Sequence, residues 1–527
     1  MDNNDDDNRN KGFNSFSLSP FAIMRNMVSW QQQSATAWTE TYKEFAACSQ
    51  KISESWSDAL WKTWISKEGL QSRENVSLQG HIDNNNNNTY KNNKKKMRAL
   101  VLQGGGAIGA FQAGAFRALY QKITREDKED GNEGKPLFDI VSGTSIGAIN
   151  AAVLVSHVME NKTWKGSAEK LVEFWKYLSC PTPDITKIST NWKKEHDKNN
   201  LNAASTEAAR RYYSVKEFFK SGVDKVYSPL PPKEDEKFFD QENKRILYNK
   251  QPLQKSIEKF VKFPIATNYE KGEPRLLVVS VDATEGIPVT FDSYEGIKVQ
   301  HVMASASLPE FYDYEEISGH KFWDGGILSN TPIRELIQAH KDFWEYKIGS
   351  KELENTILEE ASFSVPDLEL YIVNLWHSND NVAPPDPDGM TERHRDIKSH
   401  DQYYVKESIL LTHYIHLIEE LIQLGFSKNN NNNNNNNYEL KKDINKILQN
   451  YTASIDTEEI PKKYLDIIKA QFEITKIESI ERRDDDDTIS AKDGDFTSET
   501  INKLIKDGYE STWRKYPQSI LQQQQQK

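Results

Sequence analysis

The stretch "FDIVSGTSIGAINAAVLV", residues 138–155, leads from apolar residues through a serine between two glycines into a helical pattern. Residues 138–142 predict a buried strand, and residues 147–158 predict a buried helix. Ser145 stands at their junction, where a sharp turn would strain the backbone and project the hydroxyl. The sequence thus allows two interpretations of Ser145, a nucleophile held on a turn or a small structural residue.

The pentapeptide Gly143-Thr144-Ser145-Ile146-Gly147 matches the nucleophile-elbow pattern G-x-S-x-G. Gly143 and Gly147 support this motif, because the turn brings neighbouring chain close and leaves room only for small residues. The pentapeptide alone is weak evidence, but an elbow also requires a strand before it and a helix after it. Both are predicted here, so the context favours the nucleophile.

A second glycine-rich stretch lies upstream, where "RALVLQGGGAIG" (98–109) predicts a strand that opens directly into a helix. Gly104, Gly105 and Gly106 permit a tight turn with unshielded backbone N–H groups, and Gly109 completes the motif. N–H groups at a helix N-terminus carry partial positive charge. Two uses fit them, a phosphate cradle or an oxyanion hole for a tetrahedral intermediate.

The same run satisfies G-x-G-x-x-G, so dinucleotide binding is an alternative function. That fold predicts an acidic residue at the end of the second strand. Here the strand leads into Ser142-Gly143-Thr144-Ser145, which contains no acid. A Walker-type phosphate loop also fails, because no Gly-Lys-Ser/Thr follows the glycines.

A serine nucleophile needs a base, and "HKFWDGGILSNTPIREL" (320–336) supplies Asp324 at the end of an apolar aromatic run. Gly325 and Gly326 follow it and permit another segment to approach the carboxylate closely. Asp-Gly-Gly alone is most often a turn. Because Asp-Gly-Gly follows the two glycine motifs along the chain, Asp324 is the candidate base.

A histidine base is the alternative to Asp324. Four histidines lie in or near the strand-rich segments: His301, His320, His340 and His377. In the order of the α/β-hydrolases the histidine follows the acid, which would select His340 or His377. Ser305 and Ser307 in "HVMASASLP" are interpreted as helix packing near the site.

The order strand, helix, strand, helix predicts an α/β fold with a parallel sheet and right-handed crossovers. A buried strand is also predicted at "RLLVVSV" (275–281), and further strands are predicted at "IPVTFDS" (287–293) and "LELYIVNLW" (368–376). An amphipathic helix is predicted at residues 409–426, with further helical segments after it.

With these motifs in this order, the sequence resembles the patatin-like phospholipase family. The resemblance rests on "ALVLQGGGAIGAFQAGAF", "VSGTSIGAINA" and "HVMASASLPEFYDYEEISGHKFWDGGILSNTP". It continues through "MTERHRDIKSHDQYY", which is similar to a subgroup with an additional C-terminal region. Many members carry a basic residue where this chain has Ile108.

The resemblance implies a three-layer α/β sandwich with a mainly parallel sheet. It implies that Ser145 is the nucleophile and Asp324 the base of a catalytic dyad, with Gly104, Gly105 and Gly106 in the oxyanion loop. The implied activity is hydrolysis of lipid acyl esters through an acyl-enzyme, with no metal and no cofactor. A non-catalytic lipid-binding protein of the same fold is a second alternative.

Three regions are expected along the chain. Residues 1–95 hold a disordered start, an amphipathic Trp-rich helix from Pro20 to Trp64 and an Asn-rich linker. Residues 96–345 form the hydrolase domain, in which residues 160–270 are an insertion or cover. Residues 346–527 add a strand and a helical region with low-complexity inserts. The Trp-rich helix would pack on protein or lie at a lipid surface.

Composition limits the partners and the location. Net charge is −12 and mean hydropathy −0.76, which argues against nucleic acid as a partner. The two cysteines fit a reducing compartment, and neither a secretory signal nor a membrane span is evident. We expect a cytoplasmic protein, peripheral at a membrane or lipid droplet, with lipid as substrate; the oligomeric state is open.

Overall fold

The computed structural model describes residues 95–182, 203–230, 248–309, 311–359, 365–376, 387–427, 435–453, 462–482 and 492–514. The predicted Trp-rich helix and the Asn-rich linker lie outside these residues. None of the helices in the described ranges is long and apolar enough to cross a lipid bilayer.

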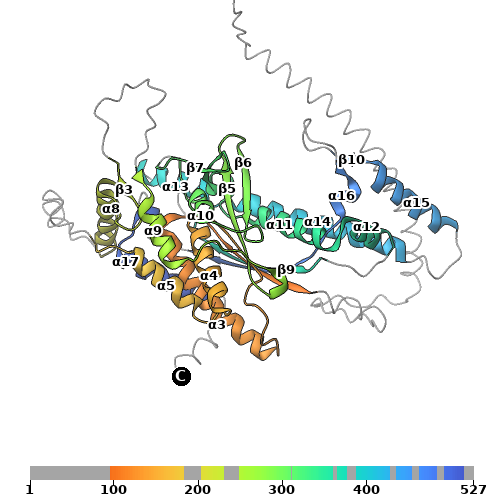
Figure 1. Cartoon of the computed structure of the whole chain (residues 1–527), viewed down its shortest axis with the longest axis horizontal. Coiled ribbons are helices and arrows are strands. Elements are labelled where there is room, and N and C mark those ends of the chain that lie inside the picture. Colours follow the sequence, from red (N-terminus) through yellow and green to blue (C-terminus); the bar gives the residue numbers. More distant parts are fainter. Residues whose placement is uncertain are drawn as a thin grey trace, which may run out of the picture. The chain divides into compact units, whose positions relative to one another are not determined.

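An eight-stranded sheet forms the centre of the described chain (Figure 1). Its order is β12 (Ile474–Glu481), β9 (Asp367–Asn374), β1 (Lys96–Leu102), β2 (Ile140–Thr144), β5 (Arg275–Asp282), β8 (His320–Asp324) and β7 (Glu315–Ile317), and β6 (Ile287–Asp292) also pairs with β5. The five strands from β12 to β5 are parallel. Strands β6, β8 and β7 pair antiparallel, so the predicted mainly parallel sheet is confirmed and its last strands make it mixed.

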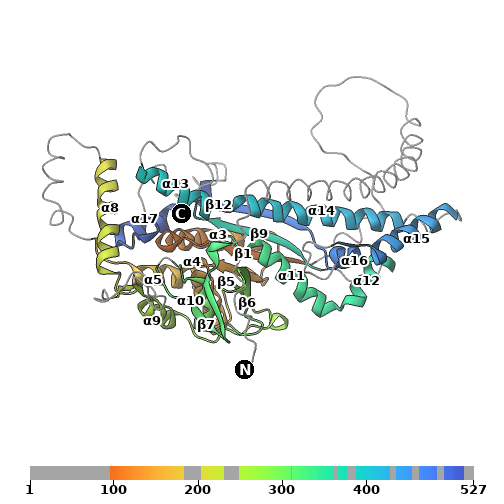
Figure 2. The ribbon, with the colours of Figure 1, turned by 90° about the horizontal axis from the view of Figure 1, so that it is seen from above.

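Alternate residues of β1 face two separate cores, as expected for a strand buried on both sides. Leu100 and Leu102 join one apolar cluster, and Ala99 and Val101 join the other. The first cluster is covered by α3 (Ala110–Glu129), α4 (Ile146–Asn161), α5 (Ser167–Leu178), α9 (Gln251–Phe260) and α17 (Ser498–Arg514). The second is covered by α11 (Ile333–Ile348), α12 (Ser350–Glu359) and α14 (Gln402–Ser427). Figure 2 shows these helix layers, and the predicted three-layer α/β fold is confirmed.

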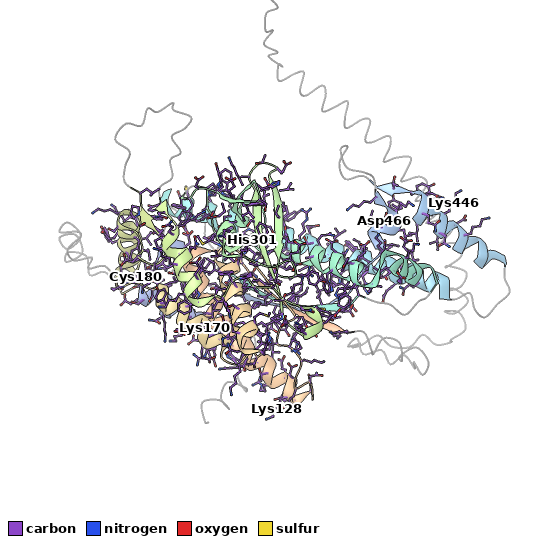
Figure 3. All side chains as sticks on the ribbon, viewed as in Figure 1. Lys128, Lys170, Cys180, His301, Lys446 and Asp466 are labelled. Carbon is purple, nitrogen blue, oxygen red and sulfur yellow. The ribbon has the colours of Figure 1, made fainter. Side chains whose placement is uncertain are left out.

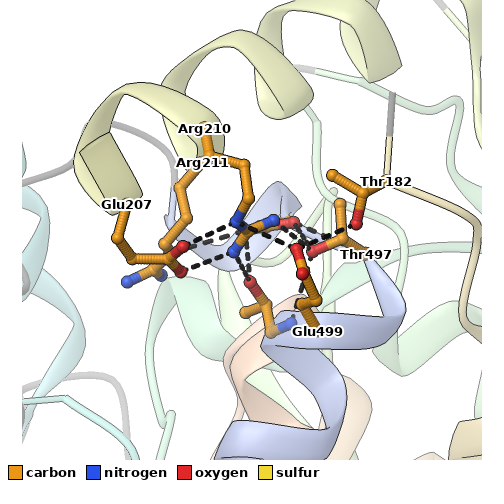
Figure 4. Close-up of polar contacts among 8 residues, drawn as sticks. Thr182, Glu207, Arg210, Arg211, Thr497 and Glu499 are labelled. Atoms are coloured by element: carbon orange, nitrogen blue, oxygen red, sulfur yellow. Dashed lines mark hydrogen bonds and ion pairs between the residues drawn. The ribbon is translucent and has the colours of Figure 1, made fainter. Parts of the chain in front are cut away.

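The predicted cover contributes α8 (Ala203–Ser221) to the described chain, and ion pairs join this helix to the segment that leads into α17 (Figure 4). Arg210 donates to the Thr497 hydroxyl at 2.9 Å, and Arg211 lies 3.4 Å from Asp495. Asp495 is fully buried and also accepts a hydrogen bond of 2.6 Å from the Thr500 hydroxyl. A buried carboxylate needs such partners, so this network ties the cover to the C-terminal segment.

Shorter elements complete the described chain. They are η1 (Gly106–Gly109), β3 (Ser228–Pro229), β4 (Tyr248–Asn249), η2 (Tyr269–Lys271), α10 (Val299–Ser305), η3 (Gly325–Ile327), α13 (Pro387–Ser399), α15 (Asn435–Asn450), β10 (Thr452–Ala453), β11 (Lys462–Lys463), α16 (Tyr464–Ile468) and η5 (Lys492–Gly494).

Candidate active site

Ser145 occupies a strained turn between β2 and α4. Its φ and ψ are 55° and −125°, outside the regions that a serine ordinarily adopts. A Cβ at Gly143 would lie 2.4 Å from the backbone of Gly147, and one at Gly147 would lie 2.1 Å from the Leu102 carbonyl. Both positions therefore require glycine, and the turn has the geometry of a nucleophile elbow.

The Ser145 hydroxyl donates a hydrogen bond of 2.6 Å to Oδ2 of Asp324, so the structure brings these two predicted residues together. Asp324 ends β8 and is 1% exposed. Its other oxygen, Oδ1, accepts from the Gly326 N–H at 2.7 Å, which fixes the carboxylate plane. A Cβ at Gly325 would lie 2.3 Å from the Val279 carbonyl, so only glycine lets the turn after Asp324 sit against β5.

The glycine-rich loop lies beside the serine, where a Cβ at Gly104 would be 3.1 Å from Cβ of Ser145. Asn330 holds Gly104 on both sides: its carbonyl accepts the Gly104 N–H at 3.1 Å, and its amide donates to the Gly104 carbonyl at 3.2 Å. Within the described chain, the N–H groups of Gly105 and Gly106 donate to no backbone carbonyl. The N–H groups of Gly105 and Gly106 are therefore left for a ligand by the backbone.

Two further glycines of this loop are required by close packing. Gly106 has a φ of 53°, and a Cβ there would lie 2.5 Å from the Asp493 carbonyl. At Gly109 a Cβ would lie 2.7 Å from the Ile146 side chain. Ile108 is fully buried in the core.

Behind the loop lies a polar network that sequence reasoning did not identify. Gln103 accepts the backbone N–H groups of Leu375 and Trp376 at 2.6 and 3.0 Å and donates to the Thr331 hydroxyl at 2.7 Å. Asp401 accepts the Thr331 N–H at 2.6 Å and the Thr331 hydroxyl at 2.5 Å. Burial raises the pKa of Asp401 to about 6, against the hydrogen bonds from Thr331 that lower it.

Ser305 also touches the turn. Its hydroxyl accepts the Ser145 N–H at 2.9 Å and donates to the Val279 carbonyl at 2.5 Å. Ser305 thus connects the elbow to β5, which agrees with its interpretation as a packing residue near the site. Ser307 is fully buried and accepts from Nζ of Lys250 at 2.6 Å.

An apolar cavity of about 110 Å³ opens beside Ser145 and Gly106. Apolar side chains from several elements line it, among them Ile149, Leu178, Phe219, Val226, Leu253 and Phe496. Burial raises the pKa of two lining phenols, Tyr227 and Tyr312, so both are neutral across the physiological range. The cavity therefore suits an apolar chain, and the cover and the C-terminal segment both contribute to its wall.

One ion pair lies among the residues that line the cavity. Nη1 of Arg395 donates to Oδ1 of Asp493 at 2.6 Å, and both residues line the cavity. They come from α13 and η5, far downstream of the three motifs. No local sequence pattern indicates that these segments return to the glycine loop.

Each candidate histidine base within the described residues contacts groups other than Ser145. His301, labelled in Figure 3, stacks on Phe291 with ring centroids 4.3 Å apart. His320 lies 2.9 Å from Asp282, and His340 lies 2.9 Å from the Pro366 carbonyl. His377 lies outside the described residues. In the part of the chain that the structure describes, no group of three or more His, Cys, Asp or Glu side chains is arranged to hold a metal ion.

The motif-bearing part of the chain matches a known family. Residues 100–337 match the family described as patatin-like phospholipase. Among solved structures, VipD from Legionella pneumophila is similar, with 12% identity and a TM-score of 0.26. That match covers 80% of this chain and 66% of the VipD chain, less than two thirds of its length. No curated protein matches the chain. A domain of this family implies lipid acyl hydrolase activity, and residues 100–337 of this chain belong to the patatin-like phospholipase family.

Proposed function

We propose that the protein is a serine hydrolase of lipid acyl esters that works through Ser145 and Asp324 and an acyl-enzyme. The observation that carries the proposal is the hydrogen bond of 2.6 Å from the Ser145 hydroxyl to the buried Asp324 carboxylate, at the edge of an apolar cavity. A hydroxyl, a carboxylate and unshielded N–H groups around one space are what acyl transfer requires.

In the first step Oγ of Ser145 forms a bond to the ester carbonyl carbon. The hydroxyl proton passes along the existing hydrogen bond to Oδ2 of Asp324. The Gly326 N–H holds the other carboxylate oxygen, so Asp324 keeps the oxygen that faces Ser145 in place. The strained elbow holds Oγ near the carbonyl before attack, which lowers the entropic part of the barrier.

The negative charge that develops on the carbonyl oxygen needs donors that are already oriented. The N–H groups of Gly105 and Gly106 are proposed for this role, because the Gly104 N–H is taken by the Asn330 carbonyl. Loss of one such donor typically raises the barrier by about 3 kcal/mol.

Collapse of the tetrahedral intermediate breaks the ester C–O bond. The proton on Asp324 passes to the leaving alcohol, and the acyl group stays on Ser145. A water molecule then attacks the acyl-enzyme and gives its proton to Asp324. That proton returns to Oγ as the fatty acid leaves, so the enzyme ends in its starting state.

The test combines labelling by a fluorophosphonate with release of fatty acid from lipids of several classes. The Ser145→Ala variant is expected to lose both the label and turnover, and Asp324→Asn to lose most turnover. Ser179→Ala and Asp130→Asn are matched controls, because Ser179 caps the end of α5 and Asp130 is exposed at the end of α3. Labelling of Ser145→Ala at the rate of the parent would contradict the role of Ser145. Vesicle binding without any fatty-acid release would instead support a non-catalytic lipid-binding protein.

A further inference from the structure

Helix α14 carries a row of large apolar side chains in solvent. Eight of them are between 42% and 69% exposed: Tyr403, Tyr404, Leu410, Leu411, Tyr414, Leu417, Ile418 and Leu421. Their spacing of three and four residues puts them on one side of the helix, which we name the α14 face. Glu407 is the one charged residue at that spacing between Tyr403 and Leu421.

The opposite side of α14 packs against the rest of the described chain. Val405 and Ile409 pack against the core beneath the sheet, and Ile415 and Ile422 pack against the apolar cluster of α15 and α16. Figure 2 shows α14 alongside α15 and α16. The α14 face therefore contributes nothing to these contacts, and exposed apolar patches of this extent commonly mark interaction sites.

The width of the α14 face indicates a broad partner. Neighbouring residues such as Leu410 and Leu411, or Leu417 and Ile418, are both exposed, so the apolar band is wider than a coiled-coil seam. From Tyr403 to Leu421 it extends about 27 Å at 1.5 Å per residue. A long, broad apolar band on a helix with polar flanks is typical of a helix that lies in a lipid interface.

The α14 face is continuous with the candidate active site through the junction between α13 and α14. Ser399 at this junction accepts from the Asn330 amide at 2.6 Å, and Asp401 binds Thr331. One turn earlier on α13, Arg395 lines the cavity. A surface bound at the junction would thus lie next to the residues that support the glycine loop.

Two exposed lysines lie at this junction, together with one exposed acid, Glu407, near the start of α14. Lys398 and Lys406 are exposed on either side of it. The acidic residues Glu392 and Asp396 of α13 are buried instead, where they lie 3.6 and 2.7 Å from the fully buried Lys492. Exposed lysines beside apolar side chains complement the anionic headgroups of a phospholipid surface.

We propose that the α14 face docks the protein on a phospholipid bilayer that contains anionic lipids, with Lys398 and Lys406 at the headgroups. This inference rests on the proposed function for its substrate, which would be phospholipid taken from the docked bilayer. Met390 and Ile397 of α13, both more than half exposed, would extend the contact across the junction.

The experiment measures partition of the full chain onto phosphatidylcholine vesicles with and without phosphatidylserine. The test variant joins Leu411→Gln with Ile418→Gln. The control joins Ile287→Gln with Tyr346→Gln, two apolar residues on β6 and α11 that are 53% and 77% exposed. A second variant, Lys398→Gln with Lys406→Gln, tests the charge. Turnover of a soluble short-chain ester in the same samples reports the folded active site.

We expect the test variant to bind vesicles about tenfold more weakly than the parent, while the control binds like the parent. The ratio of bilayer turnover to soluble-ester turnover should fall by a similar factor. The lysine variant should lose the preference for phosphatidylserine. A parent chain with no soluble-ester turnover but intact, α14-dependent vesicle binding would refute the proposed function and leave the docking surface standing.

Other outcomes would overturn the docking proposal. Equal vesicle binding by the parent and the test variant would do so, as would a parent that does not bind vesicles. If the parent sedimented as a dimer and the test variant as a monomer with unchanged vesicle binding, the α14 face would be a contact between two copies. If the test variant lost thermal stability without any change in vesicle binding, another segment of this chain, such as residues 20–64, would cover the face.

Discussion

Asp401 accepts two hydrogen bonds from Thr331, one from the backbone N–H at 2.6 Å and one from the hydroxyl at 2.5 Å. The next residue upstream of Thr331 is Asn330, which holds Gly104. Asp401 therefore supports the glycine loop from the C-terminal part of the chain. Burial raises the pKa of Asp401 from 3.8 to about 6, so the carboxylate is ionised at neutral pH at a cost to folding.

Replacing Asp401 by Asn should change how stability depends on pH. Because its pKa is raised by folding, the Asp401 carboxyl contributes its full stability below about pH 4 and loses it as pH rises through about 6. The Asn side chain carries no charge, so the Asp401→Asn variant does not lose this contribution. Between pH 4 and 7 the free energy of unfolding of the variant should therefore rise by roughly 1–3 kcal/mol relative to that of the parent. Urea unfolding of both proteins across this range measures the gain. A constant difference at every pH would show that Asp401 does not titrate in this window.

Ser305 is expected to position the nucleophile through its hydrogen bond to the Ser145 N–H. Ser305→Ala removes this acceptor from a buried N–H, which typically costs about 1–3 kcal/mol. We expect kcat to fall about tenfold or more with little change in KM, because the binding cavity is untouched. Ser305→Thr keeps the hydroxyl and should restore most of the loss. Equal kcat for the parent and Ser305→Ala would show that the elbow holds its shape without this contact.

The apolar cavity should set which acyl chains are accepted. Ile149 lines it from α4 and is almost fully buried. Ile149→Phe would fill part of a cavity of about 110 Å³, so we expect kcat/KM for long acyl chains to fall about tenfold relative to short chains. Ile149→Leu has equal volume and is the matched control. A uniform loss across all chain lengths would mean that the acyl chain lies elsewhere.

The central motifs could be predicted because each is short and lies at the end of a strand. Ser145 and the three loop glycines follow β2 and β1, neighbours in a parallel sheet, whose ends meet at the same edge. Asp324 ends β8, which pairs with β5 antiparallel, yet its side chain still reaches Ser145. The order of the motifs along the chain predicts this pair, whereas no sequence pattern predicts that β8 runs antiparallel to β5.

The rest of the site depends on contacts between residues far apart in the chain. Asp401 lies 70 residues from Thr331, and Asp493 lies 387 residues (493 − 106) from Gly106. No sequence pattern around either aspartate marks it as part of the site. Asn330 lies six residues after Asp324, but its role follows from the hydrogen bonds that its carbonyl and amide make with Gly104, which the sequence does not predict. Strand β12 likewise joins the sheet beside β9 across more than a hundred residues.

The packing of α17 on α3 gives the last prediction, because two glycines let these helices approach closely. A Cβ at Gly114 of α3 would lie 1.8 Å from the Ile505 carbonyl, and one at Gly508 of α17 would lie 2.0 Å from the Phe111 carbonyl. Gly508→Ala must therefore push the helices apart, and we expect a loss of about 1–3 kcal/mol in the free energy of unfolding. Lys506→Ala, at a residue 74% exposed on the same helix, should stay within about 0.5 kcal/mol of the parent. Since α17 follows the segment that carries Asp493 and Phe496 into the cavity wall, Gly508→Ala should also weaken binding of long-chain esters. Equal stability of Gly508→Ala and the parent would show that α17 does not pack on α3 at this distance.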